Sequence, residues 1–168
     1  MAGPDGVVVR TATTADLPAM AEIYNDAVLH SLATFDLEPQ PPEHFAARVV
    51  STRPGDHVVV AEEHGRLVGM AYAVTYRARP AYDGTRETSV YLAPDARGRG
   101  LGRALYDEVL RRVDADGIHV CLAVIAQPNP ASEALHTAVG FRHVGTLRDV
   151  GRKFDRWVDT ALWQRLRP

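Results

Sequence analysis

A glycine-rich turn constrains the fold of this chain more than any other feature of its sequence. The turn reads RGRGLG at residues 97–102 and follows ETSVYL at 87–92, whose β-branched and aromatic residues predict a strand. After the turn, apolar residues recur on one helical face from residue 100 to about residue 115. An ordered glycine costs roughly 0.5–1 kcal/mol of backbone entropy relative to alanine. Three glycines in one turn therefore indicate that the backbone itself comes close to a ligand, between a strand and a helix.

The turn predicts an anion-binding site, because the first N–H groups of a helix lack partners within it and lie at the positive end of the helix dipole. Four arginines surround the turn, namely Arg97, Arg99, Arg103 and Arg111. A nucleoside triphosphate would require a lysine and a hydroxyl residue after the last glycine, where the chain has Arg103 and Ala104. A dinucleotide would require G-x-G-x-x-G in a first strand–helix–strand unit, but these glycines are spaced differently and lie past the middle of the chain. The diphosphate of coenzyme A remains as the anion.

Composition and charge are those of an ordinary globular domain, and we expect residues 1–168 to form one domain. The net charge of −2 argues against nucleic acid binding. No apolar segment approaches the ~20 residues that span a membrane, and MAGPDGVVVR at 1–10 lacks the pattern of a secretory signal. Cys121 is the single cysteine, so an internal disulfide is excluded and a reducing compartment is favoured. We therefore expect a cytoplasmic protein that binds neither membranes nor nucleic acid.

Apolar periodicity and turn residues predict the order of elements along the chain. Strands are expected at 7–10, 57–63, 66–76, 87–92, 119–126, 141–154 and 157–164. Helices are expected at 14–30, 41–51, 100–115 and 129–139, and a loop at 77–86. The near-continuous apolar segment at 119–126 is typical of a strand that is covered on both faces. This order predicts an α/β fold with a mixed central β-sheet flanked by helices on both faces.

The RGRGLG turn matches R/Q-x-x-G-x-G/A, the diphosphate-binding signature of the GNAT acetyltransferase superfamily. Three longer segments resemble its phosphinothricin and methionine sulfoximine N-acetyltransferase family: RARPAYDGTRETSVYL (77–92), ETSVYLAPDARGRGLGRALYDEVL (87–110) and AVIAQPNPASEALHTAVGFRHVGTL (123–147). The resemblance extends over about residues 7–165. It implies the GNAT acetyltransferase fold, a homodimer, and direct transfer of the acetyl group of acetyl-CoA to the amine of a small amino-acid-like substrate.

The resemblance also implies which residues bind acetyl-CoA. Main-chain groups of the strand before the turn would bind the cofactor, namely those of Val90, Tyr91 and Leu92. The diphosphate would lie beside Arg97 and against the main-chain N–H groups of Gly98, Arg99, Gly100, Leu101, Gly102 and Arg103. Asn129, at the start of the next predicted helix, and Ser132 complete the set. An asparagine at a helix start satisfies free N–H groups, and the family's asparagine also bonds to the pantetheine arm, so one residue can serve both purposes.

Two side chains and one main-chain N–H group are candidates for the chemical steps. Glu87 occupies the position of the family's catalytic glutamate, where a carboxylate can take the proton of a substrate ammonium group directly or through a water. The resemblance also implies that a main-chain N–H of this strand donates to the oxyanion of the tetrahedral intermediate, and Leu92 is the candidate for it. His136 stands where the family has a histidine, which could protonate the departing thiolate or only contact the cofactor. Cys121 has no base near it in the sequence, so we interpret it as a core residue.

The acceptor site implied by the resemblance consists of Phe35, Arg77, Ala78, Arg79, Glu87, Thr88 and Ser89. Planar guanidinium groups such as those of Arg77 and Arg79 suit the α-carboxylate of an amino-acid-like substrate. The herbicide-detoxifying relatives carry a K-H-G-N-W-H-D type segment near the C-terminus, whereas residues 153–159 here read KFDRWVD. Both histidines are absent, which bears on phosphinothricin turnover if this hairpin reaches the substrate pocket.

Two other functions compete with the leading one. The same cofactor could serve a polyamine, an antibiotic amine or a protein N-terminus, for which an acidic pocket would speak, whereas the two arginines favour a carboxylated acceptor. The chain could also be a non-catalytic acetyl-CoA-binding module, against which the presence of Glu87 argues. The histidines have neither metal-ligand spacing nor neighbouring cysteines, so no metal site is predicted.

Overall fold

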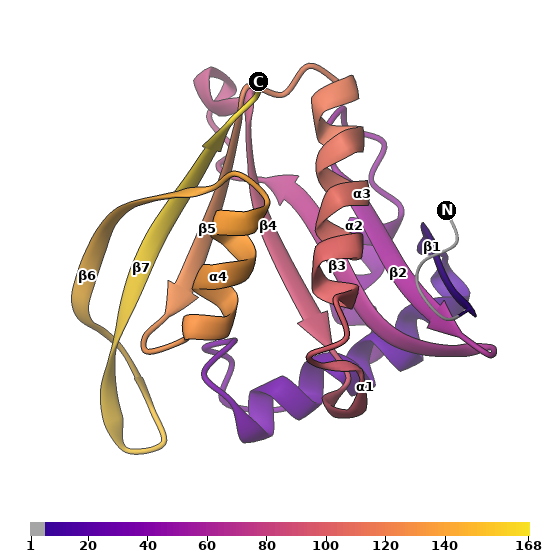
Figure 1. Cartoon of the computed structure of the whole chain (residues 1–168), viewed down its shortest axis with the longest axis horizontal. Coiled ribbons are helices and arrows are strands. Elements are labelled where there is room, and N and C mark those ends of the chain that lie inside the picture. The colour runs from indigo at the N-terminus through magenta and orange to yellow at the C-terminus, as the bar shows by residue number, and fades with distance from the viewer. Residues whose placement is uncertain (1–5) are drawn as a thin grey trace.

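The computed structural model describes residues 6–168 and shows a seven-stranded β-sheet with the strand order β1-β2-β3-β4-β5-β7-β6 (Figure 1). The strands are β1 (Val7–Thr11), β2 (His57–Glu63), β3 (Arg66–Thr75), β4 (Thr85–Leu92), β5 (Val120–Ala126), β6 (Arg142–Lys153) and β7 (Arg156–Leu166). Neighbouring strands are antiparallel except β4 and β5, which are parallel. The sheet is therefore mixed, as predicted.

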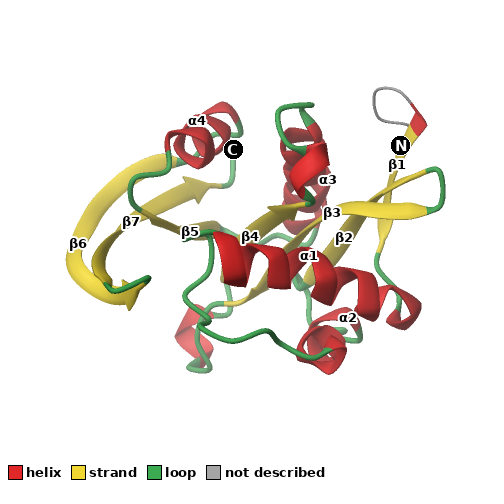
Figure 2. Ribbon diagram, turned by 90° about the horizontal axis from the view of Figure 1, so that it is seen from below, coloured by secondary structure: helices red, strands yellow, loops and turns green. Residues whose placement is uncertain are grey.

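Helices cover both faces of this sheet (Figure 2). The α-helices are α1 (Leu17–His30), α2 (Ala46–Val49), α3 (Leu101–Ala115) and α4 (Pro130–Ala138). α1 and α2 lie on one face, and α3 and α4 lie on the other (Figure 2). This arrangement confirms the α/β fold predicted from the sequence.

The centre of the core lies where α3 packs on β2 and β3. The predicted apolar face of α3 is fully buried and consists of Leu101, Leu105, Val109 and Val113. Cys121 of β5 is buried as well, and this burial raises the pKa of its thiol to about 11. A thiol that resists ionisation is a poor nucleophile, in agreement with its interpretation as a core residue.

Four predicted elements differ from the observed ones by more than a residue at one end. The helix expected at 14–30 begins as a 3-10 turn at Thr14–Asp16 before α1, and the last strand, β7, ends two residues later than expected. The helix expected at 41–51 is a 3-10 turn at Pro42–Phe45 followed by the short α2, because neighbouring prolines at 41 and 42 lack N–H donors and restrict the backbone. β4 begins two residues earlier than expected, because its parallel pairing with β5 already starts at Thr85 opposite Val120. Glu87 is therefore the third residue of this strand rather than its first.

A buried ion pair fixes the entry into α1. Asp16 accepts two hydrogen bonds of 2.8 Å from the Arg10 guanidinium and one of 2.7 Å from the Thr13 N–H. The bonds from Arg10 contribute most to holding the pKa of the Asp16 carboxyl at about 2, below the ordinary aspartate value. Because the folded-state pKa is lowered, the stabilisation is complete above the ordinary aspartate pKa and is lost as the pH falls toward about 2.

We expect Asp16→Asn to lower the free energy of unfolding at pH 7 by about 2 kcal/mol, which is the order of the pKa change at a carboxyl this well buried. Urea unfolding of both proteins at pH 7 and at about pH 2 measures the effect. The difference between the proteins should shrink at the lower pH, and an equal difference at both values would contradict the ion-pair explanation.

Candidate active site

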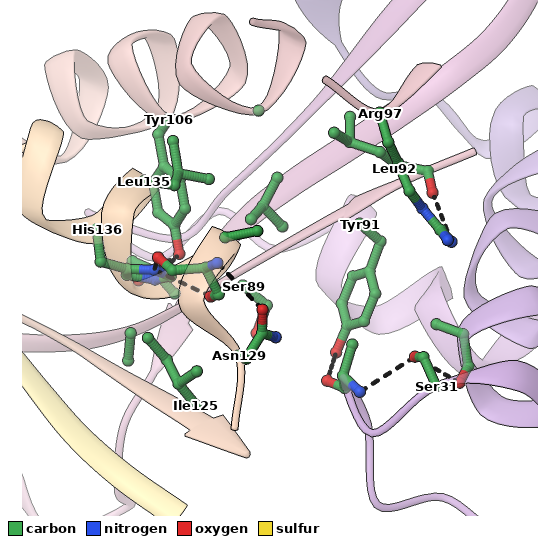
Figure 3. A pocket seen from close by; sticks show the side chains of 18 of the residues that line it. Ser31, Ser89, Tyr91, Leu92, Arg97, Tyr106, Ile125, Asn129, Leu135 and His136 are labelled. Atoms are coloured by element: carbon green, nitrogen blue, oxygen red, sulfur yellow. Dashed lines mark hydrogen bonds between the residues drawn. The ribbon is translucent and has the colours of Figure 1, made fainter. Parts of the chain in front are cut away.

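β4 and β5 separate halfway along their length and leave a cleft between them (Figure 3). The two strands pair only from Thr85 opposite Val120 to Glu87 opposite Leu122. Beyond this point, residues 88–92 of β4 and 123–126 of β5 are unpaired with each other and line opposite walls. α1, α3 and α4 complete the walls of a cavity of about 530 Å³. The closed end of the cleft is therefore at Glu87 and Leu122.

The glycine-rich turn forms part of the cleft wall at the start of α3. Gly98 and Gly100 have φ angles of +73° and +78°, which L side chains rarely adopt. A Cβ at either position would meet no heavy atom within 4 Å, so there is open space beside the main chain. Gly102 differs, because a Cβ there would lie 3.1 Å from Leu135 of α4. The first two glycines thus serve the backbone conformation and leave room for a ligand, and the third lets α3 approach α4.

The arginines beside the turn are each paired with a carboxylate of another residue. Arg97 donates to Asp26 of α1 at 2.8 Å, and Arg99 forms two hydrogen bonds with Glu63 at the end of β2. Arg103 lies 3.5 Å from Asp107, one turn further along α3. These pairs reduce the net charge around the turn, so much of its attraction for an anion has to come from main-chain N–H groups and the helix dipole.

Asn129 caps the first turn of α4, as predicted. Its Oδ1 accepts a hydrogen bond of 3.1 Å from the Ser132 N–H, and Pro130 follows in the first turn, where no N–H donor is needed. The cap points α4 at the cleft, and both Asn129 and Ser132 line it. The amide nitrogen of Asn129 donates no hydrogen bond to any residue in the described part of the chain, so it is available to a ligand.

A buried pair of polar rings, Tyr106 and His136, lies at one side of the cleft (Figure 3). His136 Nδ1 lies 2.7 Å from the Ser132 carbonyl oxygen, which can only accept, so Nδ1 carries the proton. Nε2 then accepts from the Tyr106 hydroxyl, 2.8 Å away. Burial lowers the pKa of His136, so the imidazole is neutral at pH 7. Donation of a proton from Nε2 would require prior protonation and a turn of the Tyr106 hydroxyl.

Sequence reasoning missed Tyr106, although a signal was present. Tyr106 follows Gly102 by four residues and therefore lies on the helix face that carries the glycine turn. Its hydroxyl also lies 3.4 Å from Thr88 Oγ1, and the Thr88 hydroxyl donates to the Leu122 carbonyl at 3.2 Å. The bond from Thr88 satisfies the Leu122 carbonyl just where β4 and β5 cease to pair.

Glu87 lies at the closed end of the cleft, on the opposite face of β4 from Thr88. Its side chain is half-buried, and desolvation raises its pKa above the ordinary glutamate value. Within residues 6–168 it takes part in no ion pair, so no neighbouring cation offsets this desolvation. A carboxylate with a raised pKa is a stronger base than one on the surface, which suits proton abstraction.

The structure gathers most of the predicted site residues at the cleft and leaves others outside it. The wall includes Thr88, Ser89, Val90, Tyr91, Leu92, Arg97, Gly98, Gly100, Gly102, Arg103, Asn129, Ser132 and His136. The wall does not include Phe35, Arg77, Ala78, Arg79, Glu87, Arg99 and Leu101. The Leu101 side chain is in the core, and only its main chain faces the turn.

The predicted acceptor arginines lie in the exposed segment between β3 and β4. The Arg77 guanidinium stacks on the rings of Tyr76 and Tyr82, with its carbon 4.9 and 5.6 Å from their centroids. Ala78 and Arg79 are exposed beside it. These residues therefore stand apart from the cleft between β4 and β5, and the structure does not bring them into contact with it.

The β6–β7 hairpin does reach the cleft wall, through the loop after α1. Lys153 is buried, and its ammonium donates a hydrogen bond of 2.8 Å to the Thr34 carbonyl. The Phe35 ring packs directly on Gly151. Ala33 of the same loop lines the cleft, so the altered 153–159 segment is coupled to the cleft wall through two neighbouring residues.

Residues 9–162 match the family model described as an acetyltransferase (GNAT) domain. The chain belongs to the GNAT acetyltransferase family, as its sequence predicted. Among curated proteins it is 42% identical to a phosphinothricin N-acetyltransferase of Streptomyces coelicolor, over 98% of this chain and 99% of the relative. It is 38% identical to an L-methionine sulfoximine/L-methionine sulfone acetyltransferase of Pseudomonas paraeruginosa, over 93% and 92% of the two chains. A solved structure of a phosphinothricin acetyltransferase from Sinorhizobium meliloti in complex with acetyl-CoA superimposes with a TM-score of 0.89 at 40% identity, covering 96% of this chain and 88% of that one.

Two further kinds of feature are absent from the part of the chain that the structure describes. Within residues 6–168, no helix has both the length and the apolar character that a membrane crossing requires. In that same part of the chain, His, Cys, Asp and Glu side chains form no group of three or more able to hold a metal ion.

Proposed function

We propose that this chain is a single-domain N-acetyltransferase that moves the acetyl group of acetyl-CoA to the amine of a small amino-acid-like substrate. The observation that carries the proposal is the cleft between β4 and β5, which is open beside Gly98 and Gly100 at the start of α3. The names of the two similar curated proteins, a phosphinothricin N-acetyltransferase and a methionine sulfoximine/sulfone acetyltransferase, support this class of acceptor.

The cleft offers acetyl-CoA two kinds of main-chain contact. The diphosphate would bind main-chain N–H groups of residues 98–103 at the start of α3, with Arg97 beside it. The pantetheine arm carries amides, and residues 90–92 of β4 have no strand partner on the side of β5. The arm can therefore bond to this strand edge as an added strand would, and Asn129 and Ser132 would bond to it from α4.

The transfer would be direct, without an acyl-enzyme intermediate. Glu87 accepts a proton from the substrate ammonium group, and the free amine attacks the thioester carbonyl. The Leu92 main-chain N–H donates to the resulting oxyanion, and the C–S bond breaks as the carbonyl reforms. The nitrogen of the intermediate loses its surplus proton and the departing thiolate takes one up, directly or through a water, which leaves a neutral amide and free coenzyme A. His136, neutral and held by Tyr106, contacts the cofactor, and it would protonate the thiolate only after rearrangement of that hydrogen bond.

A panel of amines tests the proposal by thiol release from acetyl-CoA. The panel contains methionine sulfone, methionine sulfoximine, phosphinothricin, ordinary amino acids, a polyamine and an aminoglycoside. Release with the sulfone, the sulfoximine or phosphinothricin would support the proposal. Release with the polyamine or the aminoglycoside alone would mean that the acceptor is not an amino-acid-like compound but an amine of that other class. No release with any amine would favour a non-catalytic acetyl-CoA-binding module.

Although Arg77 and Arg79 lie outside the cleft wall, we propose that they bind the substrate carboxylate, because their exposed guanidinium groups suit a carboxylate. The double variant Arg77→Ala/Arg79→Ala is expected to raise the KM for a carboxylated amine by about tenfold or more, which is the loss of one charged hydrogen bond. The KM for the corresponding amide, which lacks the negative charge, should change much less. Steady-state kinetics with both substrates measures the effect, and equal changes would remove the arginines from carboxylate recognition.

We also propose a cytoplasmic homodimer. β6 is an edge strand, and the hairpin that it forms with β7 exposes Val144, Leu147, Val150 and Trp157. Light scattering of the purified protein should give twice the chain mass, and Trp157→Glu should shift the protein toward monomer. A monomeric mass for the unmodified protein at micromolar concentration would contradict this part of the proposal.

A further inference from the structure

Arg86 is a buried cation that the proposed chemistry does not use. It lies directly before Glu87 in β4, and its side chain is only 3% exposed. A buried guanidinium is unfavourable unless its donors are satisfied. Successive strand residues point to opposite faces of a sheet, so the Arg86 side chain lies on the other face from Glu87. It therefore cannot reach a substrate amine that is bound beside Glu87.

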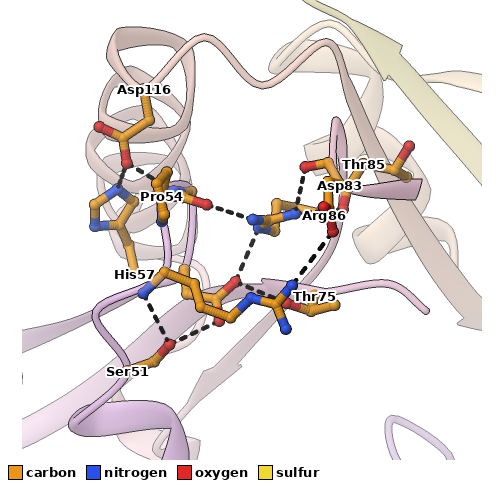
Figure 4. A network of polar contacts seen from close by, with 11 residues as sticks. Ser51, Pro54, His57, Thr75, Asp83, Thr85, Arg86 and Asp116 are labelled. Atoms are coloured by element: carbon orange, nitrogen blue, oxygen red, sulfur yellow. Dashed lines mark hydrogen bonds and ion pairs between the residues drawn. The ribbon is translucent and has the colours of Figure 1, made fainter. Parts of the chain in front are cut away.

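The guanidinium of Arg86 joins two segments that are distant in sequence (Figure 4). Nη1 donates to the main-chain carbonyls of Asp83 at 3.0 Å and Thr85 at 2.8 Å, at the start of β4. Nη2 donates to the Pro54 carbonyl in the loop before β2. Nε forms an ion pair with Asp56 of that loop at 2.8 Å. Three main-chain carbonyls thus accept hydrogen bonds from one side chain and hold it against both segments, and the Asp56 carboxylate pairs with Nε by charge, since Nε has no hydrogen-bond partner among the described residues.

The loop that receives Arg86 is itself held in place. Asp56 accepts from the Ser51 hydroxyl at 2.8 Å, and Asp116 accepts from the Gly55 N–H at 2.7 Å (Figure 4). Gly55 has a φ of +83°, and a Cβ there would lie 2.9 Å from Arg86 Nε and closer still to Ile118. The site is therefore built around the guanidinium, with space for it and no other side chain.

We propose that Arg86, paired with Asp56, is a positioning residue that fixes the start of β4 and thereby holds Glu87 at the closed end of the cleft. The inference rests on the proposed function, in which Glu87 is the base. Glu87 opposite Leu122 is the last pair before β4 and β5 separate, so its place depends on the backbone that Arg86 ties down. The same bonds to Asp83 and Thr85 also anchor the end of the segment that carries Arg77 and Arg79.

Two variants test the inference. Arg86→Met removes the cation, and the double variant Arg86→Met/Asp56→Leu removes the pair without leaving a buried charge alone, which protects folding. Binding of coenzyme A by calorimetry gives the number of intact cofactor sites and is expected to be unchanged. The kcat per site for the acceptor that the unmodified protein uses is expected to fall 10- to 100-fold, the size of a misplacement of about 1 Å.

The pH profile supplies a readout that a merely structural role would not move. If Glu87 loses its place and gains water, the acid limb of kcat against pH should move to lower pH, because desolvation is what raises the Glu87 pKa. Arg53→Met is the matched control, since Arg53 lies in the same loop but its ion pair with Asp83 at 3.3 Å is exposed. This control should leave both kcat and the profile unchanged.

Three outcomes would overturn the inference. The first is an unchanged kcat per site with an unchanged pH profile in a variant that binds coenzyme A. The second is loss of coenzyme A binding in both variants, which would assign the pair to overall folding. The third is an unmodified protein that binds coenzyme A but acetylates no amine of the panel. That result would overturn the proposed function itself, and the amine panel detects it before any Arg86 variant is measured.

Discussion

Replacing Glu87 by glutamine is expected to lower kcat by 10²- to 10⁴-fold while leaving the affinity for acetyl-CoA almost unchanged. Glutamine keeps the shape of the side chain but cannot accept the proton of an ammonium group. The cofactor contacts proposed for this chain lie on residues 90–103 and on α4, and Glu87 lies outside that set. Steady-state kinetics and calorimetry with coenzyme A measure the two quantities separately.

The pH dependence of the unmodified enzyme follows from the same side chain. Burial raises the pKa of Glu87, so the carboxylate that acts as base is lost at a higher pH than for an exposed glutamate. Turnover should therefore fall as the pH is lowered through this raised pKa. The acid limb of kcat should disappear in Glu87→Gln, and a limb that persists in the variant would assign it to another group.

The thermal stability of Glu87→Gln shows whether its loss of turnover comes from the chemistry or from unfolding. A raised folded-state pKa means that the ionised form of Glu87 is disfavoured in the folded protein, so folding becomes less favourable as the pH rises from the ordinary glutamate pKa to the raised one. A neutral glutamine avoids this cost, and Glu87→Gln should unfold at the same temperature as the unmodified protein or a higher one. Glu43→Gln, at an exposed position, is the control and should keep full turnover. Undiminished turnover of Glu87→Gln at all pH values would remove Glu87 from the role of base.

Gly100→Val is expected to abolish binding of acetyl-CoA within the range of calorimetry. A branched side chain at Gly100 would occupy the open space beside the main chain where the diphosphate is proposed to lie. It would also disfavour the φ of +78° from which α3 begins, and so misdirect the first N–H groups of that helix. Both effects act on the cofactor rather than on the acceptor.

Gly65→Val is the matched control for this prediction. Gly65 lies in the turn between β2 and β3, has a φ of +79°, and a Cβ there would also meet nothing within 4 Å. Valine therefore imposes the same backbone strain and the same solvent-side bulk at a position outside the cleft wall. Gly65→Val should lose some stability and retain coenzyme A affinity. Unchanged affinity in Gly100→Val would contradict the diphosphate assignment.

Much of the fold could be predicted from the sequence, because the relevant signals are local. Alternation in strands, the apolar stripe of α3 and the turn residues His64 and Gly65 depend on neighbours a few positions apart. The glycine turn also predicted a ligand site at the start of a helix, because three glycines there let the backbone come close to a ligand. Element boundaries were less certain where pairing across the sheet decided them, as at Thr85 opposite Val120.

The candidate site was predicted only in part, because some of its contacts are made within a few residues of the chain and others join distant segments. Asn129 could be identified, because its cap is made within three residues of the chain. Tyr106 could not be assigned a partner, because His136 lies 30 positions away and meets it only through the packing of α3 on α4. The protonation of His136 likewise follows from the Ser132 carbonyl and the Tyr106 hydroxyl together.

The sequence by itself determined the family, the α/β fold and the place of the glycine turn at the start of a helix. Only the tertiary structure decided where β4 and β5 part, which carboxylate each arginine meets, and that Arg86 is buried beside Asp56 while Arg77 is exposed. Preferences for helix, strand or turn depend on a few adjacent residues, so they can be recognised in the sequence. The burial and pairing of a charge depend on segments brought together from distant parts of the chain, and these exist only once the sheet has formed.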